Sequence, residues 1–248
     1  MGFQDEYYLR MKEILGKIEV TQKEALDESA QAIAEVISRG GVFHIMDTGH
    51  MLMYEGVGRS GGMMAARPLH VTVDVDNPVH PRATAAERKK VFMDGIEGLP
   101  EYIIARGDVE AGDILLIGSV SGVKTLPVGL ALAAKEAGVI TIGLTSLAYS
   151  SSLKSQHTSG KRLFEVVDHV LDNCCPPGDA LVMVPELGQE ICPSTGIAAA
   201  YLMWSLQARV VEIMLAKGLK PAMFMSHRLP NAAEHNKTAW EQYEKLGY

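Results

Sequence analysis

Small hydroxylated side chains gather in the segment Ser119-Val120-Ser121-Gly122-Val123-Lys124-Thr125. It follows a continuous apolar run and opens a predicted helix, and open α/β sheets bind ligands at such positions, beyond the carboxyl ends of their strands. The helix N-terminus offers unpaired N–H groups and partial positive charge, and Ser119, Ser121 and Thr125 add hydroxyl donors. Gly122 lets the backbone approach closely, and Lys124 adds a positive charge. The segment suits a phosphate or another oxyanion, although a serine-rich turn that caps a helix would use the same residues.

A second hydroxyl-rich segment follows the next apolar run and begins with Thr145-Ser146. Because the carboxyl ends of parallel strands meet at one edge of a sheet, this segment strengthens the expectation of a polar, anionic ligand. His157 lies in the polar loop that comes next, where its neighbours suit either ligand contact or an ordered surface loop. Neither segment matches the glycine fingerprints of dinucleotide or Walker nucleotide sites, so no nucleotide cofactor is expected.

The elements that position these loops are readable from apolar runs. Residues 114–118 and 139–144 are continuously apolar and are joined by a predicted helix over 126–137, which makes a βαβ unit with parallel strands covered on both faces. Residues 42–46 form a further predicted strand that runs into the turn Asp47-Thr48-Gly49-His50. We expect a helical stretch from this turn through Arg59, and one more strand over 166–171.

Helical periodicity dominates both ends of the chain. Apolar residues recur at spacings of three and four over the first forty residues, and Gly40-Gly41 ends the run. The long segment 197–215 is apolar on more than one side, so it fills the core or packs against another subunit. We therefore expect a single domain over 1–248, with N-terminal helices over 1–40, an α/β core over 41–220 and a C-terminal tail over 221–248.

The composition excludes several classes of protein. The 248 residues carry a net charge of −7, with 47% hydrophobic and 21% charged residues, which are ordinary values for a globular protein. No basic run indicates binding to nucleic acid or to an anionic membrane, no apolar stretch is long enough to span a bilayer, and the polar start is no secretory signal. Three cysteines, two of them adjacent (Cys174, Cys175), form no disulfide framework, so we expect a reduced, cytoplasmic protein. We expect that pair to pack in a turn and to carry no thiol mechanism, since no base lies near it in sequence.

Taken in order, the segments 42–62, 112–152 and 159–166 resemble the sugar isomerase (SIS) superfamily. They are most similar to the small bacterial UPF0309 group, which is related to phosphoheptose isomerase. The resemblance extends over nearly the whole chain, including Ser194-Thr195 and Glu234-His235-Asn236. It implies a three-layer α/β/α sandwich with a mainly parallel, flavodoxin-like sheet. It also implies a phosphosugar ligand bound near a subunit interface, and hence a homo-oligomer, either a dimer or a tetramer.

The resemblance also implies roles for individual residues. It places phosphate on the loop of Ser119, Ser121 and Gly122, makes the turn Thr48-Gly49-His50 another wall of the site, and aligns Glu55 with a catalytic glutamate. The catalytic candidates are Glu55, His50 and His235, and the ligand-binding candidates are Thr48, Gly49, Ser119, Ser121, Gly122, Lys124, Thr125, Thr145, Ser146, His157, Ser194 and Thr195. His70 and His80 could join Glu55 and His50 around a metal, but no ligand spacing supports this, so no metal is expected.

The chain departs from the family pattern at two places. Family members usually carry Gly-Ser-Gly-His-Ser-His before Met-Leu, whereas this chain has Asp47-Thr48-Gly49-His50 before Met51-Leu52. A ligand-contacting hydroxyl is lost and Asp47 replaces a glycine, which lowers the expected phosphate affinity and leaves a neutral sugar or another anion as alternatives. The loop at Val123-Lys124 also lacks the Arg-Asn that is common there.

These observations favour an aldose–ketose isomerase or epimerase that acts on a phosphorylated sugar. In such an enzyme Glu55 would move the proton between adjacent carbons, since a partly desolvated carboxylate has a suitable pKa, and a histidine would assist. A non-catalytic sugar-phosphate sensor is the alternative from another class. A SIS-type lyase that cleaves a sugar ether ranks last, because a second active-site glutamate stretch is missing.

Overall fold

The computed structural model describes residues 2–49, 51–52, 54–74, 92–93, 96 and 98–248. A five-stranded parallel sheet lies at the centre, in the order β2-β1-β3-β4-β5. Its strands are β1 (Phe43–Asp47), β2 (Ala66–Pro68), β3 (Ile114–Gly118), β4 (Ile140–Thr145) and β5 (His169–Asp172). The expected parallel, flavodoxin-like sheet is confirmed.

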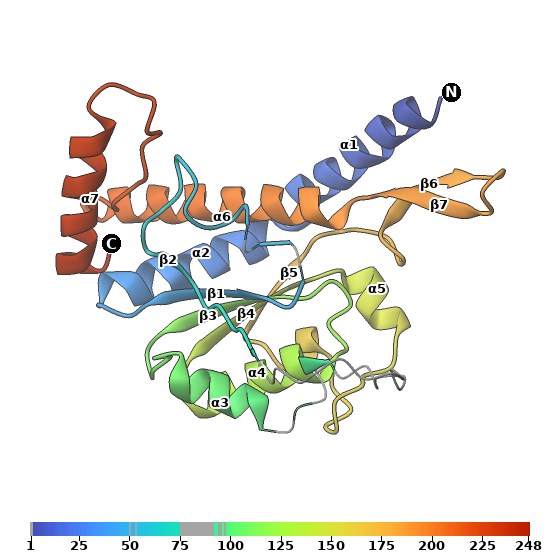
Figure 1. Cartoon of the computed structure of the whole chain (residues 1–248), viewed down its shortest axis with the longest axis horizontal. Coiled ribbons are helices and arrows are strands. Elements are labelled where there is room, and N and C mark those ends of the chain that lie inside the picture. The colour runs from blue at the N-terminus through green and yellow to red at the C-terminus, as the bar shows by residue number, and fades with distance from the viewer. Residues whose placement is uncertain (1, 50, 53, 75–91, 94–95, 97) are drawn as a thin grey trace, which may run out of the picture.

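Strand β3 shows how the sheet is buried on both faces. Its five residues are all buried, and alternate side chains point to opposite faces. Ile114 and Leu116 pack in one core with α2 (Lys23–Ser38) and α6 (Thr195–Ala216), whereas Leu115 and Ile117 pack in a second core with α3 (Leu99–Arg106) and α4 (Thr125–Glu136). The three-layer sandwich and the βαβ unit are thus confirmed (Figure 1).

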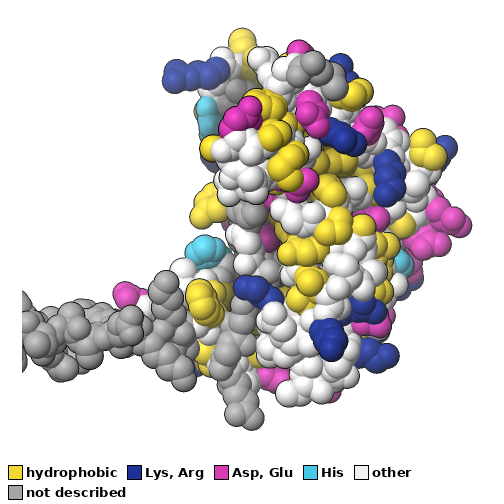
Figure 2. Space-filling model, turned by 90° about the vertical axis from the view of Figure 1, so that its right-hand side faces the viewer, with side chains coloured by type: hydrophobic (Ala, Val, Ile, Leu, Met, Phe, Trp, Pro, Cys, Tyr) yellow, Lys and Arg dark blue, Asp and Glu magenta, His cyan; other side chains and the backbone are white. Residues whose placement is uncertain are grey.

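The N-terminal helical run is divided at Gln22. Helix α1 (Phe3–Thr21) precedes this break and α2 follows it, ending before Gly40, whose φ of +88° suits glycine. Helix α1 projects beyond the sheet beside an antiparallel hairpin of β6 (Ala180–Val184) and β7 (Gln189–Pro193), which the sequence reading did not predict (Figure 1). Figure 2 views the molecule from this end, where hydrophobic side chains lie among charges of both signs.

Short helices and a terminal helix complete the fold. They are α5 (Leu147–Ser152), the 3₁₀ turn η2 (Leu163–Glu165) and α7 (Ala232–Leu246), which lies within the predicted tail. The strand expected over 166–171 begins only at His169 and ends at Asp172, since residues 166–168 form a turn and a bend after η2, where Asp168 accepts a hydrogen bond from the Thr141 amide. Among the described residues, no helix is both long and apolar enough to cross a membrane.

The helical stretch expected through Arg59 is wrong. The described residues of 51–62 form turns and bends, and Gly58 has a φ of +67° that a helix does not tolerate. The side-chain amide of Gln207 on α6 donates to the carbonyl oxygen of Gly56 at 3.0 Å, and Gly56 packs against Met203. Glycines and this contact with α6 therefore replace a helix by a folded loop.

Candidate functional site

The strand order identifies where this sheet can bind a ligand. The chain runs outward from β1 to β2 on one side and from β3 to β5 on the other, so the connections diverge between β1 and β3. In sheets of this order, ligands bind beyond the carboxyl ends of the strands at that point. The turn after Asp47 and the loop after Gly118 are the segments that leave the two strands there.

A pocket of about 520 Å³ lies at this divergence point. Asp47, Thr48 and Gly49 line it from the turn after β1, and Lys124 lines it at the start of α4. The other lining residues are mostly apolar or aromatic: Met46, Tyr54, Pro68, Leu69, His70, Val71, Phe92, Met93 and Leu126. Its volume and its mixed lining are typical of small-molecule sites.

The carboxylate of Asp47, the last residue of β1, holds the following turn in place. Asp47 accepts hydrogen bonds from the amides of Gly49 at 2.8 Å and Leu52 at 2.5 Å, one on each oxygen. The amide of Thr48 donates to the carbonyl oxygen of Gly118 at 3.1 Å, which ties the turn to β3. His50 lies outside the described residues.

The loop after β3 has a fixed backbone and two uncommitted hydroxyls. Gly122 has a φ of +59° and accepts a hydrogen bond from the Leu163 amide at 2.7 Å. A Cβ on Gly122 would lie 3.0 Å from Thr145 Oγ1, so glycine is required there by both conformation and space. Ser119 is buried and Ser121 half-buried, and neither hydroxyl makes a hydrogen bond within the described structure.

The remaining hydroxyls of this edge are used to hold the loops together. Thr145 donates to the carbonyl oxygen of Val120 at 2.9 Å, and Thr125 donates to that of Gln156 at 3.3 Å. Ser146 donates to the carbonyl oxygen of Cys175 at 2.7 Å and caps α5 by accepting from the Tyr149 amide. These side chains shape the edge of the sheet, whereas Ser119 and Ser121 keep uncommitted hydroxyls; the hydroxyl of Ser150 also lacks a partner among the described residues, but it is buried.

Three further candidates lie elsewhere. Ser194 and Thr195 both hydrogen-bond Asp179 at the start of α6, where they join this helix to the hairpin. His157 accepts from the Ser159 amide through Nδ1, and its Nε2 lies 3.6 Å from the Cβ position of Gly129 on α4. None of these side chains lines the pocket.

The candidate acid and base residues are also separated. Nε2 of His235 lies 3.2 Å from the carbonyl oxygen of Met223. Its helix α7 stands at the end of the molecule opposite α5, which follows the carboxyl end of β4 (Figure 1). Glu55 pairs with Arg59 at 3.3 Å and its side chain is 46% exposed, so within one chain it lies beside the pocket, not in its lining.

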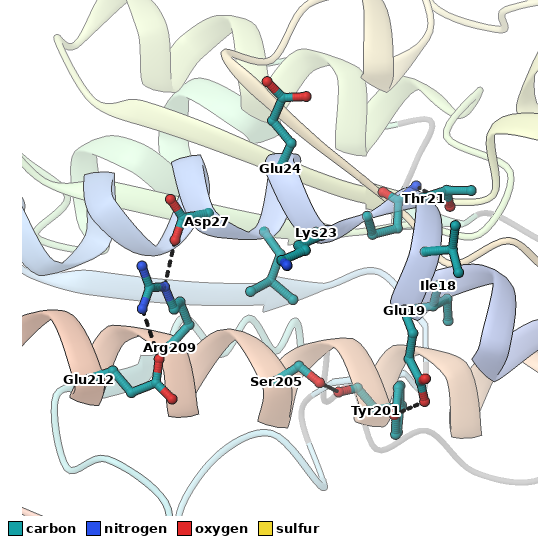
Figure 3. A pocket seen from close by; sticks show the side chains of 13 residues that line it. Ile18, Glu19, Thr21, Lys23, Glu24, Asp27, Tyr201, Ser205, Arg209 and Glu212 are labelled. Atoms are coloured by element: carbon teal, nitrogen blue, oxygen red, sulfur yellow. Dashed lines mark hydrogen bonds and ion pairs between the residues drawn. The ribbon is translucent and has the colours of Figure 1, made fainter.

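A larger groove of about 850 Å³ lies between the α1–α2 junction and α6 (Figure 3). Arg209 bridges Asp27 and Glu212 there, and this guanidinium holds the pKa of Asp27 below its usual value. The Tyr201 hydroxyl donates to Glu19 at 2.6 Å. These groups are satisfied by one another, and the groove is separate from the hydroxylated loops, so the smaller pocket is the better candidate site.

The cysteine pair is buried. Cys174 and Cys175 are both buried, and desolvation raises the pKa of both thiols, that of Cys175 to about 12. Both stay protonated near neutral pH and are poor nucleophiles. Within the described ranges no group of three or more His, Cys, Asp or Glu side chains is placed to hold a metal, and His80 lies outside those ranges.

A family model described as the SIS domain matches residues 6–146. The chain belongs to the SIS-domain family. This SIS protein is 31% identical to a UPF0309 protein of Geobacillus kaustophilus over 243 residues, which cover 97% of this chain and 94% of the relative. It is 32% identical to a UPF0309 protein of Listeria innocua over 238 residues, which cover 94% and 92%. The resemblance read from the motifs is confirmed.

Solved structures are similar at lower identity. A phosphoheptose isomerase from Francisella tularensis matches at 14% identity with a TM-score of 0.48, over 84% of this chain and 96% of that one. The sugar isomerase domain of an RpiR transcription factor from Sphaerobacter thermophilus matches at 14% identity with a TM-score of 0.43, over 98% of both chains.

Sequence reasoning missed the apolar side of the pocket. Tyr54, Leu69 and Val71 line it, although none belongs to a polar motif. Leu69 directly follows β2 and Val71 lies two residues further on. Because β2 has only three residues, Ala66–Pro68, and lies at the edge of the sheet, its signal in the sequence is weak.

Proposed function

We propose that this SIS protein binds a sugar phosphate in the pocket between the ends of β1 and β3 and isomerises it. The observation that carries this proposal is the loop between β3 and α4, in which Ser119 and Ser121 make no hydrogen bond to any described residue through their hydroxyls; the two serines do not line the pocket, but Lys124 at the end of the same loop does. The N-terminus of α4 and Lys124 add positive charge there, which favours a phosphate. A pocket of about 520 Å³ leaves room for the sugar.

In this proposal Glu55 moves the proton. Aldose–ketose isomerisation requires a base that takes a proton from one carbon and returns it to the neighbouring carbon. Glu55 follows Tyr54, which lines the pocket, and its own side chain is half-exposed at the rim. A second copy of the chain that covers this rim would desolvate Glu55 and could bring a His235 toward it. We therefore propose a homo-oligomer as the active form.

Binding is tested first, by calorimetry with inorganic phosphate and a panel of aldose and ketose monophosphates. Ser121→Ala should weaken sugar-phosphate binding about tenfold, because the hydroxyl hydrogen bond to a charged group is lost. Ser38→Ala, at the end of α2 and the opposite edge of the sheet, is the matched control and should bind like wild type. Absence of binding by the folded wild-type protein across the panel would contradict the proposal.

Turnover is tested separately by NMR with the monophosphates that bind. Glu55→Gln should lower the rate of interconversion at least about a hundredfold while binding persists, since general base catalysis contributes at least that much. The exposure of Glu55 and its pair with Arg59 favour one alternative, a sensor that binds without turnover. Binding with no product from the wild-type protein after long incubation would support the sensor and exclude the isomerase.

A further inference from the structure

Asp47 is the single carboxylate among the described residues that line the pocket. Its carboxyl carbon lies 3.4 Å from the position that a Cβ on Gly118 would take, so the charge sits directly between the carboxyl ends of β1 and β3. The two backbone hydrogen bonds from Gly49 and Leu52 hold it in that position. The carboxylate is therefore a fixed part of the pocket wall.

The chemistry of this group differs from that of the loop after β3. A carboxylate accepts hydrogen bonds and donates none, and each oxygen keeps further acceptor capacity after taking one backbone N–H. It can bind sugar hydroxyls or an ammonium group, whereas a second phosphate or a carboxylate would meet a like charge in a partly desolvated site. The pocket lining thus offers an anion the positive charge of Lys124, at the start of α4, and offers hydrogen-bond donors the carboxylate of Asp47.

We propose that Asp47 is a specificity-determining residue that restricts the site to sugars with a single phosphate. Resting on the proposed function, this assigns the orientation of the ligand: the phosphate faces the loop of Ser119 and Ser121, and donor groups of the sugar face the turn after β1. A sugar derivative that brings a second anion beside Asp47 is rejected by the charge of this carboxylate.

The test compares pairs of ligands that differ by one phosphate, such as fructose 6-phosphate with fructose 1,6-bisphosphate and the corresponding glucose phosphates. Wild-type protein should bind each monophosphate at least about tenfold more tightly than its bisphosphate, the factor that 1.4 kcal/mol represents. Asp47→Asn should bring the two affinities together by strengthening bisphosphate binding. Asp168→Asn is the matched control. Asp168 also accepts a hydrogen bond from a backbone amide, that of Thr141, but it lies at the amino end of β4. This variant should keep the wild-type ratio of monophosphate to bisphosphate affinity.

Two further measurements keep the test decisive if Asp47→Asn fails to fold. Asp47→Ser retains a hydroxyl that can cap the turn while it removes the charge, and should give the same relaxed ratio. In wild-type protein the preference for the monophosphate should shrink as salt is raised at constant pH, since salt screens a like-charge repulsion.

The outcomes separate the two proposals. If no monophosphate binds to any folded variant, the proposed function fails and this inference fails with it. If monophosphates bind, but wild type accepts bisphosphates equally or removal of the Asp47 charge leaves the ratio unchanged, the inference alone is overturned.

Discussion

Gly122 connects the loop between β3 and α4 to the neighbouring segments, because its carbonyl oxygen accepts from the Leu163 amide and the position of a Cβ on it would lie 3.2 Å from Ser150 Oγ. A methyl group there would lie 3.0 Å from Thr145 Oγ1 and 3.2 Å from Leu163 Cβ, at a φ of +59°. Gly122→Ala should therefore destabilise the protein by about 1–3 kcal/mol, the cost of a strained left-handed residue plus displaced neighbours. Urea unfolding measures this difference.

Gly160→Ala is the matched control for that substitution. Gly160 also has a positive φ, of +71°, but a methyl group there would meet nothing within 4 Å. Gly160→Ala should lower the free energy of unfolding less than Gly122→Ala does and should leave phosphate binding unchanged. Equal losses for the two variants would show that crowding around Gly122 is unimportant.

Residue types alone identified the loop but not which hydroxyls are available. Ser119, Ser121, Thr145 and Ser146 look alike in the sequence, since all follow apolar strands. Only the three-dimensional structure shows that Thr145 and Ser146 donate to the carbonyl oxygens of Val120 and Cys175. Such partners lie 25 and 29 residues away along the chain, beyond what local spacing can report.

At the scale of elements, η2 supports the loop between β3 and α4 and is itself held by a charged pair. Glu165 accepts from the Arg162 amide and from its guanidinium, both at 2.8 Å, and the guanidinium lies over the ring of Phe164 at 4.7 Å. These bonds lower the pKa of Glu165 from 4.5 to about 2. The adjoining Leu163 amide is the one that holds Gly122.

The lowered pKa predicts how this element responds to acid. Because the folded-state pKa lies below the unfolded value, the stabilisation is present above about pH 4.5 and is lost as the pH falls toward 2. Glu165→Gln should lower the free energy of unfolding at pH 7 by up to about 1 kcal/mol, since the pair is partly solvated, and the difference from wild type should shrink near pH 3.

Urea unfolding at the two pH values checks this expectation. Glu241→Gln serves as control, because its contact with Lys237 is an exposed pair at 3.9 Å and should contribute almost nothing. A loss for Glu165→Gln that is the same at pH 3 and pH 7 would rule out the charged pair as its cause.

Elements with a continuous apolar run were predictable, and those that depend on distant contacts were not. Strands β3 and β4 and helix α4 carry their own signal, because burial on both faces requires uninterrupted apolar residues. The hairpin β6–β7 has exposed residues in both strands and packs against α1, more than 150 residues earlier in the sequence. Its local sequence therefore gives little sign of a strand pair beyond Gly188, which has a φ of +64° in the turn.

At the scale of the whole molecule, the end formed by α1 and the hairpin has the features of a contact surface. Phe3, Tyr8 and Leu9 on α1 and Leu187 in the hairpin turn are each at least 46% exposed. Gly16 lies in the middle of α1, where a glycine is unfavourable for a helix, although a Cβ there would meet nothing within 4 Å in this chain. Both features favour packing against a second copy.

We expect size-exclusion chromatography with light scattering to give at least twice the 26.9 kDa mass of one chain. Leu9→Lys, which places a charge on the exposed face of α1, should shift the protein toward the monomer. Leu246→Lys changes a similarly exposed leucine, on α7, and should leave the mass unchanged. A monomeric wild-type protein would contradict the proposed oligomer.

Gln22, at the break between α1 and α2, is only 9% exposed, and its side-chain oxygen accepts from the backbone amide of Asp172 at 2.9 Å. Asp172 ends β5, the outermost strand on that side of the sheet, so a glutamine from the N-terminal helices occupies a donor that another strand could otherwise pair with. Exposed strand edges promote aggregation. Removal of the first 22 residues would uncover this edge along with the apolar contacts of α1, and such a shortened protein should precipitate during refolding.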